Sequence, residues 1–388
     1  MKFKKLISDI QTKKFINKNL ASNLEITGIS FDSRKIEPGN IFVAVKGENH
    51  DGHEYLEEAM QKGAVALVCD NPNISFKIAI PTIIVHNSRK TLAHLAAKFY
   101  DYPSKKLILV GITGTDGKTT TCEIIYNILS SSSKKVGIIS TLGVRMGNES
   151  IETGLHTTTP DALEIQKILA NMVKNNVEIA IMETSSHGLA QYRVEACDFD
   201  IGLLTNLAYD HLDYHKTLDE YKKAKAKLLQ YVADSKNITG TEKTIILNED
   251  DEHFPYFNKF KADKNIGFGI NIKSDFRATN LKTTQNRMEF LVNAENSQYS
   301  INSSLLGNHN VQNILAAIAV CRTLDISWEV IKSAIATISS VLGRLEKIDH
   351  DKGNFHVFID FAHTPQALKN VLGTVRQFTE NQIHVVFG

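Results

Sequence analysis

Short apolar runs alternate with amphipathic segments along most of this 388-residue chain. The clearest runs, rich in Val, Ile and Leu, lie at 107–114, 136–141, 177–186 and 199–207. Apolar runs of this kind, without regular polar alternation, are typical of strands buried on both faces of a parallel sheet. The segments between them carry apolar residues at helical spacing. The pattern therefore predicts an α/β fold with a doubly wound parallel sheet.

The same pattern divides the chain into three expected domains. Residues 1–104 contain two strands with an amphipathic helix between them, and they end at a proline-containing linker. Residues 105–342 hold the parallel sheet and a more strongly alternating stretch at 264–305. Residues 343–388 begin within the segment LGRLEKI, which is expected to be a hinge, and should contain a strand, a helix and a second strand, IHVVFG.

Composition narrows the class of protein. The net charge of +1 gives no reason to expect a nucleic-acid partner or an anionic membrane surface. The four cysteines form no CxxC pair, which disfavours a zinc site or a disulfide framework and favours a reducing cytoplasm. The basic N-terminus has no apolar segment behind it, and no run is long enough to span a bilayer. We expect a cytoplasmic protein that does not bind a membrane.

A glycine-rich loop joins a predicted strand to a predicted helix in the segment GITGTDGKTT. Glycines allow backbone N–H groups to face phosphate oxygens, and the helix N-terminus adds positive charge. Lys118 could then reach the β- and γ-phosphates, and the Thr119 hydroxyl could bind Mg²⁺. The pattern GxxxxGK[ST] is not fully met, because Ile112 stands in place of its first glycine. An ordinary glycine turn is the alternative. The expected ATP-binding residues here are Gly114, Thr115, Asp116, Gly117, Lys118, Thr119 and Thr120.

Two further residues have unusual positions. Glu183 lies near the end of an apolar strand, where a carboxylate could face a ligand crevice and bind Mg²⁺; a solvent-facing strand end is the alternative. Lys225 lies in a lysine-rich helix, where a solvated charged face is the default. Helical periodicity nevertheless puts Lys225 in the middle of the apolar stripe and Lys223 on the opposite side. An unpaired ammonium group on that stripe would be costly to bury.

Several segments resemble the Mur ligases. The loop TGTDGKTT is similar to the variant phosphate loop of that family and of its relative, folylpolyglutamate synthase. The segment FDSRKIEPGNIFVAVKGENHDGHEYLEEAMQKGA resembles a UDP-binding domain that folylpolyglutamate synthase lacks. ETSSHGLAQYRV and TNLAYDHLDYHKTLDEYKKAKAKLL are similar to the member of the family that adds the third residue of the peptide. The resemblance covers essentially the whole chain.

The resemblance implies a three-domain, ATP-dependent amide ligase of peptidoglycan precursor synthesis. ATP would phosphorylate the D-Glu side chain of UDP-MurNAc-L-Ala-D-Glu, and a diamino acid, meso-diaminopimelate or L-lysine, would attack the acyl phosphate. It implies ATP and Mg²⁺ as cofactors, and we expect a monomer. The alternatives are a sister Mur ligase, a folylpolyglutamate synthase-like ligase, or an inactive fragment that binds substrate without turnover.

The resemblance also implies roles for individual residues. The expected catalytic residues are Lys118, Glu183, His211 and Lys225. The lysine matching Lys225 is carbamylated in the family, and the implied metal ligands are Thr119, Glu183, His211 and carbamylated Lys225. Further ATP contacts are implied for His309, Asn310, Asn313, Arg344 and Asp360. Substrate contacts are implied for Ser33, Glu48, Asn49, His50, Thr158, Thr159, Ser185, Gln191 and Arg193.

Family members continue beyond the point that corresponds to Gly388. We therefore expect a C-terminally truncated chain with an incomplete Rossmann-like third domain. The residues that separate diaminopimelate from lysine would lie beyond Gly388. On this expectation the chain ligates an amino acid poorly, and its third domain is mobile or prone to association.

Overall fold

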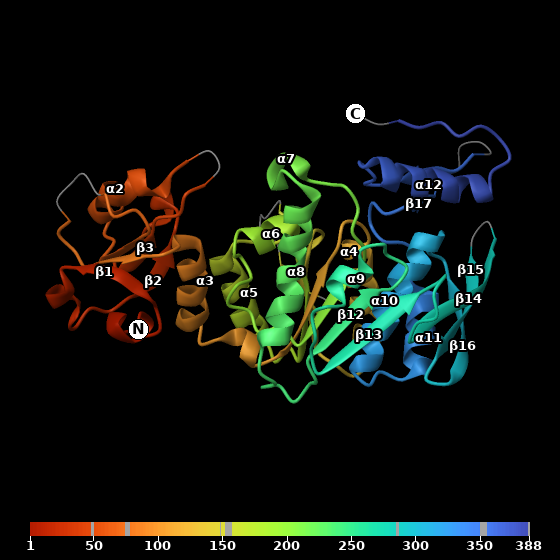
Figure 1. Cartoon of the computed structure of the whole chain (residues 1–388), viewed down its shortest axis with the longest axis horizontal. Helices are drawn as coiled ribbons and strands as arrows, with labels where there is room; N and C mark the ends of the chain where they lie inside the picture. The colour runs from red at the N-terminus through yellow and green to blue at the C-terminus, as the bar shows by residue number, and fades with distance from the viewer. Residues whose placement is uncertain are drawn as a thin grey trace. The chain divides into compact units, whose positions relative to one another are not determined.

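The computed structural model describes residues 1–47, 50–73, 78–147, 149–151, 157–284, 287–349 and 355–386 (Figure 1). The chain forms two compact units. The first comprises Met1–Lys106, Pro160–Lys174 and His187–Cys197, and the second comprises Leu107–Thr159, Asn175–Ser186 and Asp198–Gly388. Within the described ranges, no helix is long and apolar enough to cross a membrane.

The first unit is built around a five-stranded sheet in the order β1-β5-β4-β3-β2. β2 to β5 pair in parallel, and β1 joins β5 antiparallel. Successive residues of a strand point to opposite faces, so Ile41 and Val43 pack in one core while Phe42 packs in another. The strands are β1 Thr12–Ile16, β2 Gly28–Ser30, β3 Asn40–Val43, β4 Ala66–Cys69 and β5 Thr82–Val85.

The first unit also contains α-helices and 3₁₀ turns. The amphipathic helix expected between the two predicted strands is a 3₁₀ turn from Gly52 to Tyr55 and becomes α-helical at Leu56. The α-helices are α1 Phe3–Leu6, α2 Leu56–Gln61, α3 Ser88–Phe99, α5 Ala162–Lys174 and α6 Ser186–Ala190. The 3₁₀ turns are η1 Lys18–Ala21, η2 Ser33–Lys35, η3 Gly52–Tyr55 and η4 Pro103–Lys105.

The second unit contains an eleven-stranded sheet in the order β16-β15-β14-β13-β12-β11-β6-β10-β7-β8-β9. Its centre, from β7 to β14, is parallel as the apolar runs predicted, and antiparallel strands extend both edges. The strands are β6 Ile108–Thr113, β7 Val136–Ser140, β8 Gly143–Met146, β9 Glu149–Ile151, β10 Ile179–Glu183, β11 Ile201–Leu204, β12 Thr244–Asn248, β13 Lys264–Gly269, β14 Phe276–Thr283, β15 Met288–Ala294 and β16 Ser297–Ser303.

Helices pack on both faces of this sheet, which confirms the doubly wound prediction. Val110 and Ile112 of β6 belong to the core shared with α4 and α10. Gly111 faces the other way, where an added Cβ would lie 2.6 Å from Leu228 of α8. Glycine therefore lets α8 pack close to the sheet. The helices are α4 Lys118–Ser130, α7 Leu212–His215, α8 Leu218–Asp234, α9 Phe254–Phe257, α10 Asn308–Thr323, α11 Trp328–Thr337 and α12 Pro365–Gln377.

The last part of the chain differs from expectation at two elements. β17 Glu346–Ile348, which was not expected, pairs antiparallel with the expected strand, β18 Val357–Ile359, and α12 follows as predicted. The prediction of a strand at 383–388 is wrong for residues 383–386, because these residues form no strand in the structure. A strand needs a partner for its backbone groups, and Val386 is 98% exposed.

Candidate functional site

The predicted phosphate loop lies where β6 ends and α4 begins. Gly114 and Gly117 both have positive φ angles, 147° and 81°. An added Cβ would lie 1.8 Å from the Thr205 hydroxyl at Gly114 and 2.2 Å from the Asn313 side chain at Gly117. Only glycine fits at either position, so the loop backbone can lie directly against the β11–α7 connection and α10.

The segment that follows β11 fixes this loop by hydrogen bonds. Asn206 accepts the Asp116 N–H at 2.9 Å, and the Thr205 hydroxyl donates to the Asp116 carbonyl at 2.6 Å. The Thr115 hydroxyl accepts the Ala208 N–H at 2.9 Å and lies 3.2 Å from the Tyr221 hydroxyl. Sequence analysis did not single out Thr205, Asn206 or Tyr221. The sequence signal for Thr205 and Asn206 was a pair of polar residues directly after an apolar strand, and that for Tyr221 was its place on the apolar stripe of the helix that carries Lys225.

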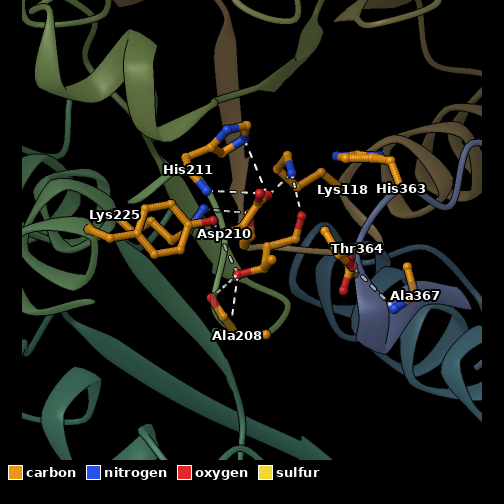
Figure 2. A network of polar contacts seen from close by, with 12 residues as sticks. Lys118, Ala208, Asp210, His211, Lys225, His363, Thr364 and Ala367 are labelled. Atoms are coloured by element: carbon orange, nitrogen blue, oxygen red, sulfur yellow. Dashed lines mark hydrogen bonds and ion pairs between the residues drawn. The ribbon is translucent and has the colours of Figure 1, made fainter. Parts of the chain in front are cut away.

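Two lysines, Lys118 and Lys225, converge on the carbonyl of Gly114. Figure 2 shows both lysines near Asp210 and His211. Lys118 donates to the Gly114 and Thr115 carbonyls at 3.0 and 2.7 Å. Lys225, which is only 1% exposed, donates to the Gly114 carbonyl at 2.6 Å and lies 4.3 Å from the centre of the Tyr221 ring. Burial lowers the pKa of Lys225 well below its ordinary value, and the charge of Lys118 lowers it further. The neutral, nucleophilic amine is thereby favoured.

Glu183 is the last residue of β10, the strand next to β6 in the sheet, and its carboxylate accepts several hydrogen bonds. It is 1% exposed, and its carboxylate accepts the Thr119 hydroxyl at 3.0 Å. The N–H and hydroxyl of Thr141 donate to it at 2.9 and 3.0 Å. Arg344 in turn donates to the Thr119 hydroxyl at 3.1 Å. The structure therefore joins three predicted residues, Thr119, Glu183 and Arg344, and adds Thr141.

His211 lies beside the lysine pair in Figure 2. It is the N-cap of α7, with φ 53°, and its Nε2 is 3.2 Å from the Asp210 carboxylate. Partial burial lowers the pKa of the imidazole, and the Asp210 charge opposes that shift. In the described part of the chain, no three His, Cys, Asp or Glu side chains are grouped to hold a metal ion.

The residues expected on the adenine side lie on α10 and near β18. Asn313 donates to the Asn310 side chain at 3.1 Å, and Asn310 donates to the Leu306 carbonyl at 2.8 Å. Burial lowers the pKa of His309 on the same helix. Asp360 accepts the Leu345 and Ala362 N–H groups at 2.6 and 2.7 Å, so in this structure it holds the segment that carries Arg344. Thr120 is buried in α4.

The predicted substrate residues fall into two groups. Thr158, Thr159 and Ser185 belong to the second unit and lie near Glu183. Thr159 donates to the Glu183 carbonyl at 3.0 Å and accepts the Ser185 N–H at 2.8 Å, while the Thr158 hydroxyl lies 3.1 Å from that of Thr141.

The other group belongs to the first unit, where Ser33, His50, Gln191 and Arg193 line a cavity of about 680 Å³. Arg193 donates to Gln191 at 2.9 Å. The two remaining predicted substrate residues, Glu48 and Asn49, lie outside the described residues.

Six further polar residues that were not predicted from the sequence line the same cavity, namely Asp32, Arg34, Tyr55, Glu58, Arg89 and Asp161. Arg89 donates to Gln191 at 3.4 Å and to the Lys46 carbonyl at 2.8 Å. It lies in the first turn of α3, where the helix dipole disfavours a cation. An arginine at the start of a helix is therefore unfavourable, and this unfavourable position was the sequence signal that could have identified Arg89 as a binding residue.

Family models match the chain in three places. The model described as "Mur ligase middle domain" matches residues 112–321. Those described as "Mur ligase family, catalytic domain" and "Mur ligase, glutamate ligase domain" match residues 25–100 and 343–388.

Individual relatives agree with these matches. A UDP-N-acetylmuramoyl-L-alanyl-D-glutamate–2,6-diaminopimelate ligase of Geobacillus thermodenitrificans is 40% identical over 94% of this chain and 73% of its own length. A protein of the same name from Listeria monocytogenes is 38% identical over 95% of this chain and 74% of its own length. A solved structure with the same ligase name superposes with a TM-score of 0.77 at 29% identity, covering 92% of this chain and 71% of that one.

Proposed function

This chain belongs to the Mur ligase family, and we propose that it is an ATP-dependent ligase that adds 2,6-diaminopimelate to UDP-MurNAc-L-Ala-D-Glu. The product is the tripeptide precursor of peptidoglycan. The observation that carries the proposal is the pair of lysines, Lys118 and Lys225, directed at one glycine of a phosphate loop. The names of the relatives support the choice of substrate and amino acid.

The proposed reaction has two steps. An oxygen of the D-Glu side-chain carboxylate attacks the γ-phosphorus of ATP, and ADP leaves. The amine of diaminopimelate then attacks the acyl carbon, phosphate leaves, and the nitrogen loses a proton to give the amide. The chain contributes mainly position and charge: the loop N–H groups and Lys118 bind the β- and γ-phosphates and stabilise charge that develops during transfer.

We propose that Mg²⁺ binds on the Glu183 side of the loop, where it would neutralise phosphate charge. The Thr119 hydroxyl and the buried Glu183 carboxylate form a pair of hard oxygens 3.0 Å apart, which suits that ion. The buried amine of Lys225 suits reaction with CO₂, because the neutral form is the reactive one. A carbamate there would supply anionic oxygens beside His211.

We further propose that the 680 Å³ cavity of the first unit binds the UDP portion of the substrate. Arg193 and Arg89 both line it, and their planar guanidinium groups suit phosphate oxygens. Ser33 and His50 would contact the nucleoside portion.

The proposal is tested by substrate-dependent phosphate release from ATP, with the peptide product identified by mass spectrometry. Release should require UDP-MurNAc-L-Ala-D-Glu and meso-diaminopimelate together, with L-lysine a poor substitute. Turnover with a folate and glutamate, or with UDP-MurNAc-tripeptide and D-alanyl-D-alanine, would assign the chain to another ligase. Binding of both substrates without turnover would contradict the catalytic proposal and leave a binding role.

A further inference from the structure

An ion pair between a buried carboxylate and a partly exposed arginine joins the phosphate-loop helix α4 to strand β8. Glu123 of α4 is 5% exposed, and its carboxylate pairs with the guanidinium of Arg145 on β8. That guanidinium also lies 4.5 Å from the centre of the Tyr126 ring, and the Tyr126 hydroxyl donates to the Gly147 carbonyl. Burial raises the pKa of the Glu123 carboxyl, while Arg145 opposes the rise. The β8–β9 hairpin is thus attached to α4 through several side chains and not only through the sheet.

Strand β8 connects Arg145 to the turn that contains Thr141. β7 and β8 pair antiparallel with Ser140 opposite Gly143, which leaves Thr141 and Leu142 as a two-residue turn. Gly143 follows with φ 107°. A turn this short between paired strands has little conformational freedom. The placement of β8 therefore determines where the N–H and hydroxyl of Thr141 point.

Thr141 in turn fixes the orientation of Glu183. Its N–H and its hydroxyl both donate to the same carboxylate oxygen, Oε2, at 2.9 and 3.0 Å. The Thr119 hydroxyl donates to the other oxygen, Oε1, at 3.0 Å and lies 3.2 Å from Oε2. Glu183 is 1% exposed, so the orientation of its carboxylate depends on these protein hydrogen bonds.

We propose that Glu123 and Arg145 are positioning residues for the metal–nucleotide side of the site. They hold the β7–β8 turn so that Thr141 keeps Glu183 directed at Thr119. The inference rests on the proposed function, because it takes Thr119 and Glu183 as the Mg²⁺–ATP side of the loop. Neither Glu123 nor Arg145 needs to touch the nucleotide. Losing either one should weaken the Mg²⁺-dependent part of nucleotide binding and leave the metal-independent part unchanged.

The test measures binding of the ATP analogue AMPPNP by calorimetry at a series of Mg²⁺ concentrations and in EDTA. Arg145→Met should raise the Mg²⁺ concentration needed for half-maximal binding by about tenfold, as expected for a residue that supports a metal ligand. Affinity in EDTA should stay at the wild-type value. Arg145→Lys keeps the charge but not the planar fork, so its shift should be smaller.

A double-mutant cycle tests the route through the turn. Thr141→Val should give a similar shift, and Arg145→Met combined with Thr141→Val should be little worse than either alone, because both act on the same carboxylate. The matched control is Lys134→Met, which breaks the half-exposed pair of Lys134 with Glu178 near the other end of β7 and β10. Its Mg²⁺ dependence should not change. Since Arg145→Met leaves a buried carboxylate unpaired, Glu123→Gln combined with Arg145→Met provides a second variant that should show the same shift.

Independent effects of Arg145→Met and Thr141→Val, multiplying to a shift near a hundredfold, would overturn the proposal. So would equal losses of AMPPNP affinity with Mg²⁺ and in EDTA. If the wild-type chain bound no AMPPNP at any Mg²⁺ concentration, the nucleotide site itself would be wrong, and the positioning role would fall with it.

Discussion

The two ends of the central parallel strands each bury a lysine, and the two lysines have different surroundings. Lys243 directly precedes β12, at the amino end, and is 3% exposed. Its ammonium lies 2.9 Å from the Asp200 carboxylate and 3.0 Å from the Phe199 carbonyl. Lys225 is directed at the loop after β6, at the carboxyl end, and donates to the Gly114 carbonyl. Among the described residues, no carboxylate lies within ion-pair distance of Lys225.

This difference in surroundings indicates that Lys243 has a structural role and Lys225 a functional one. Lys243 and Asp200 neutralise each other, and Asp200 also accepts the Leu109 N–H at 2.8 Å, so the pair ties strand starts together. At the carboxyl end Lys118 places a cation beside Lys225, and this charge favours the neutral form of Lys225 further. Burying such a group without a counter-charge costs free energy, and groups of this kind occur mainly where a ligand supplies the missing charge. The carboxyl end is therefore the expected place for an anionic nucleotide.

The largest expected effect is on turnover. Lys225→Ala should lower kcat on the order of 10³-fold, a loss typical of removing a group that stabilises transition-state charge. A short carboxylate such as acetate should restore part of the activity, since it can replace carbamate oxygens. Initial rates of tripeptide formation, with and without acetate, measure both effects.

The control for this variant is Lys223→Ala on the exposed face of the same helix, where Lys223 pairs with Asp219 and Glu220. Its rate should be close to that of wild type. Equal losses at both positions would contradict a special role for Lys225. If Lys225→Ala lost activity and acetate did not restore it, the result would argue only against the carbamate and not against a role for Lys225.

The second effect is on stability, at the other end of the strands. Lys243→Met should lower the free energy of unfolding by about 3 kcal/mol, because Asp200 is left buried without its counter-charge. Urea unfolding curves measure this loss, and kcat below the transition should stay near the wild-type value. A Lys243→Met variant that is fully stable but inactive would reverse the assignment of the two lysines.

The smallest effect concerns pH. The pKa of Lys225 is lowered in the folded chain, chiefly by burial, so between that value and the ordinary 10.5 the unfolded chain holds a proton that the folded chain lacks. The free energy of unfolding therefore rises with pH across this window. Lys225→Met removes the penalty and should stabilise the chain on the order of 1 kcal/mol at pH 7.

The stability gain of Lys225→Met should shrink as the pH approaches 10. Unfolding curves between pH 7 and pH 10 in CO₂-free buffer provide the test. A gain that stays constant with pH would show that Lys225 titrates normally in the folded chain.

Some residues of the site could be predicted from the sequence and others could not. The burial of Lys225 followed from helical periodicity, because its apolar neighbours on α8 recur every three or four residues. Thr141 and Arg89 were missed because their partners, Glu183 and Gln191, are far away in the chain. The strand expected near the C-terminus failed over 383–386 because an apolar run without a neighbouring strand has no backbone partners. The carbamate and the individual binding roles stay predictions.

The sequence by itself determined the parallel α/β architecture, the strand–loop–helix around Lys118 and the apolar face that carries Lys225. These features depend on the spacing of residues within single helices and strands, because the period of each element determines which face a side chain occupies. Only the tertiary structure decided which charges are neutralised. Asp200 meets Lys243, Glu123 meets Arg145, and Lys225 meets a carbonyl instead of a carboxylate. Such pairings depend on how distant segments pack, and burial makes each one energetically decisive because water can no longer stabilise an unpaired charge.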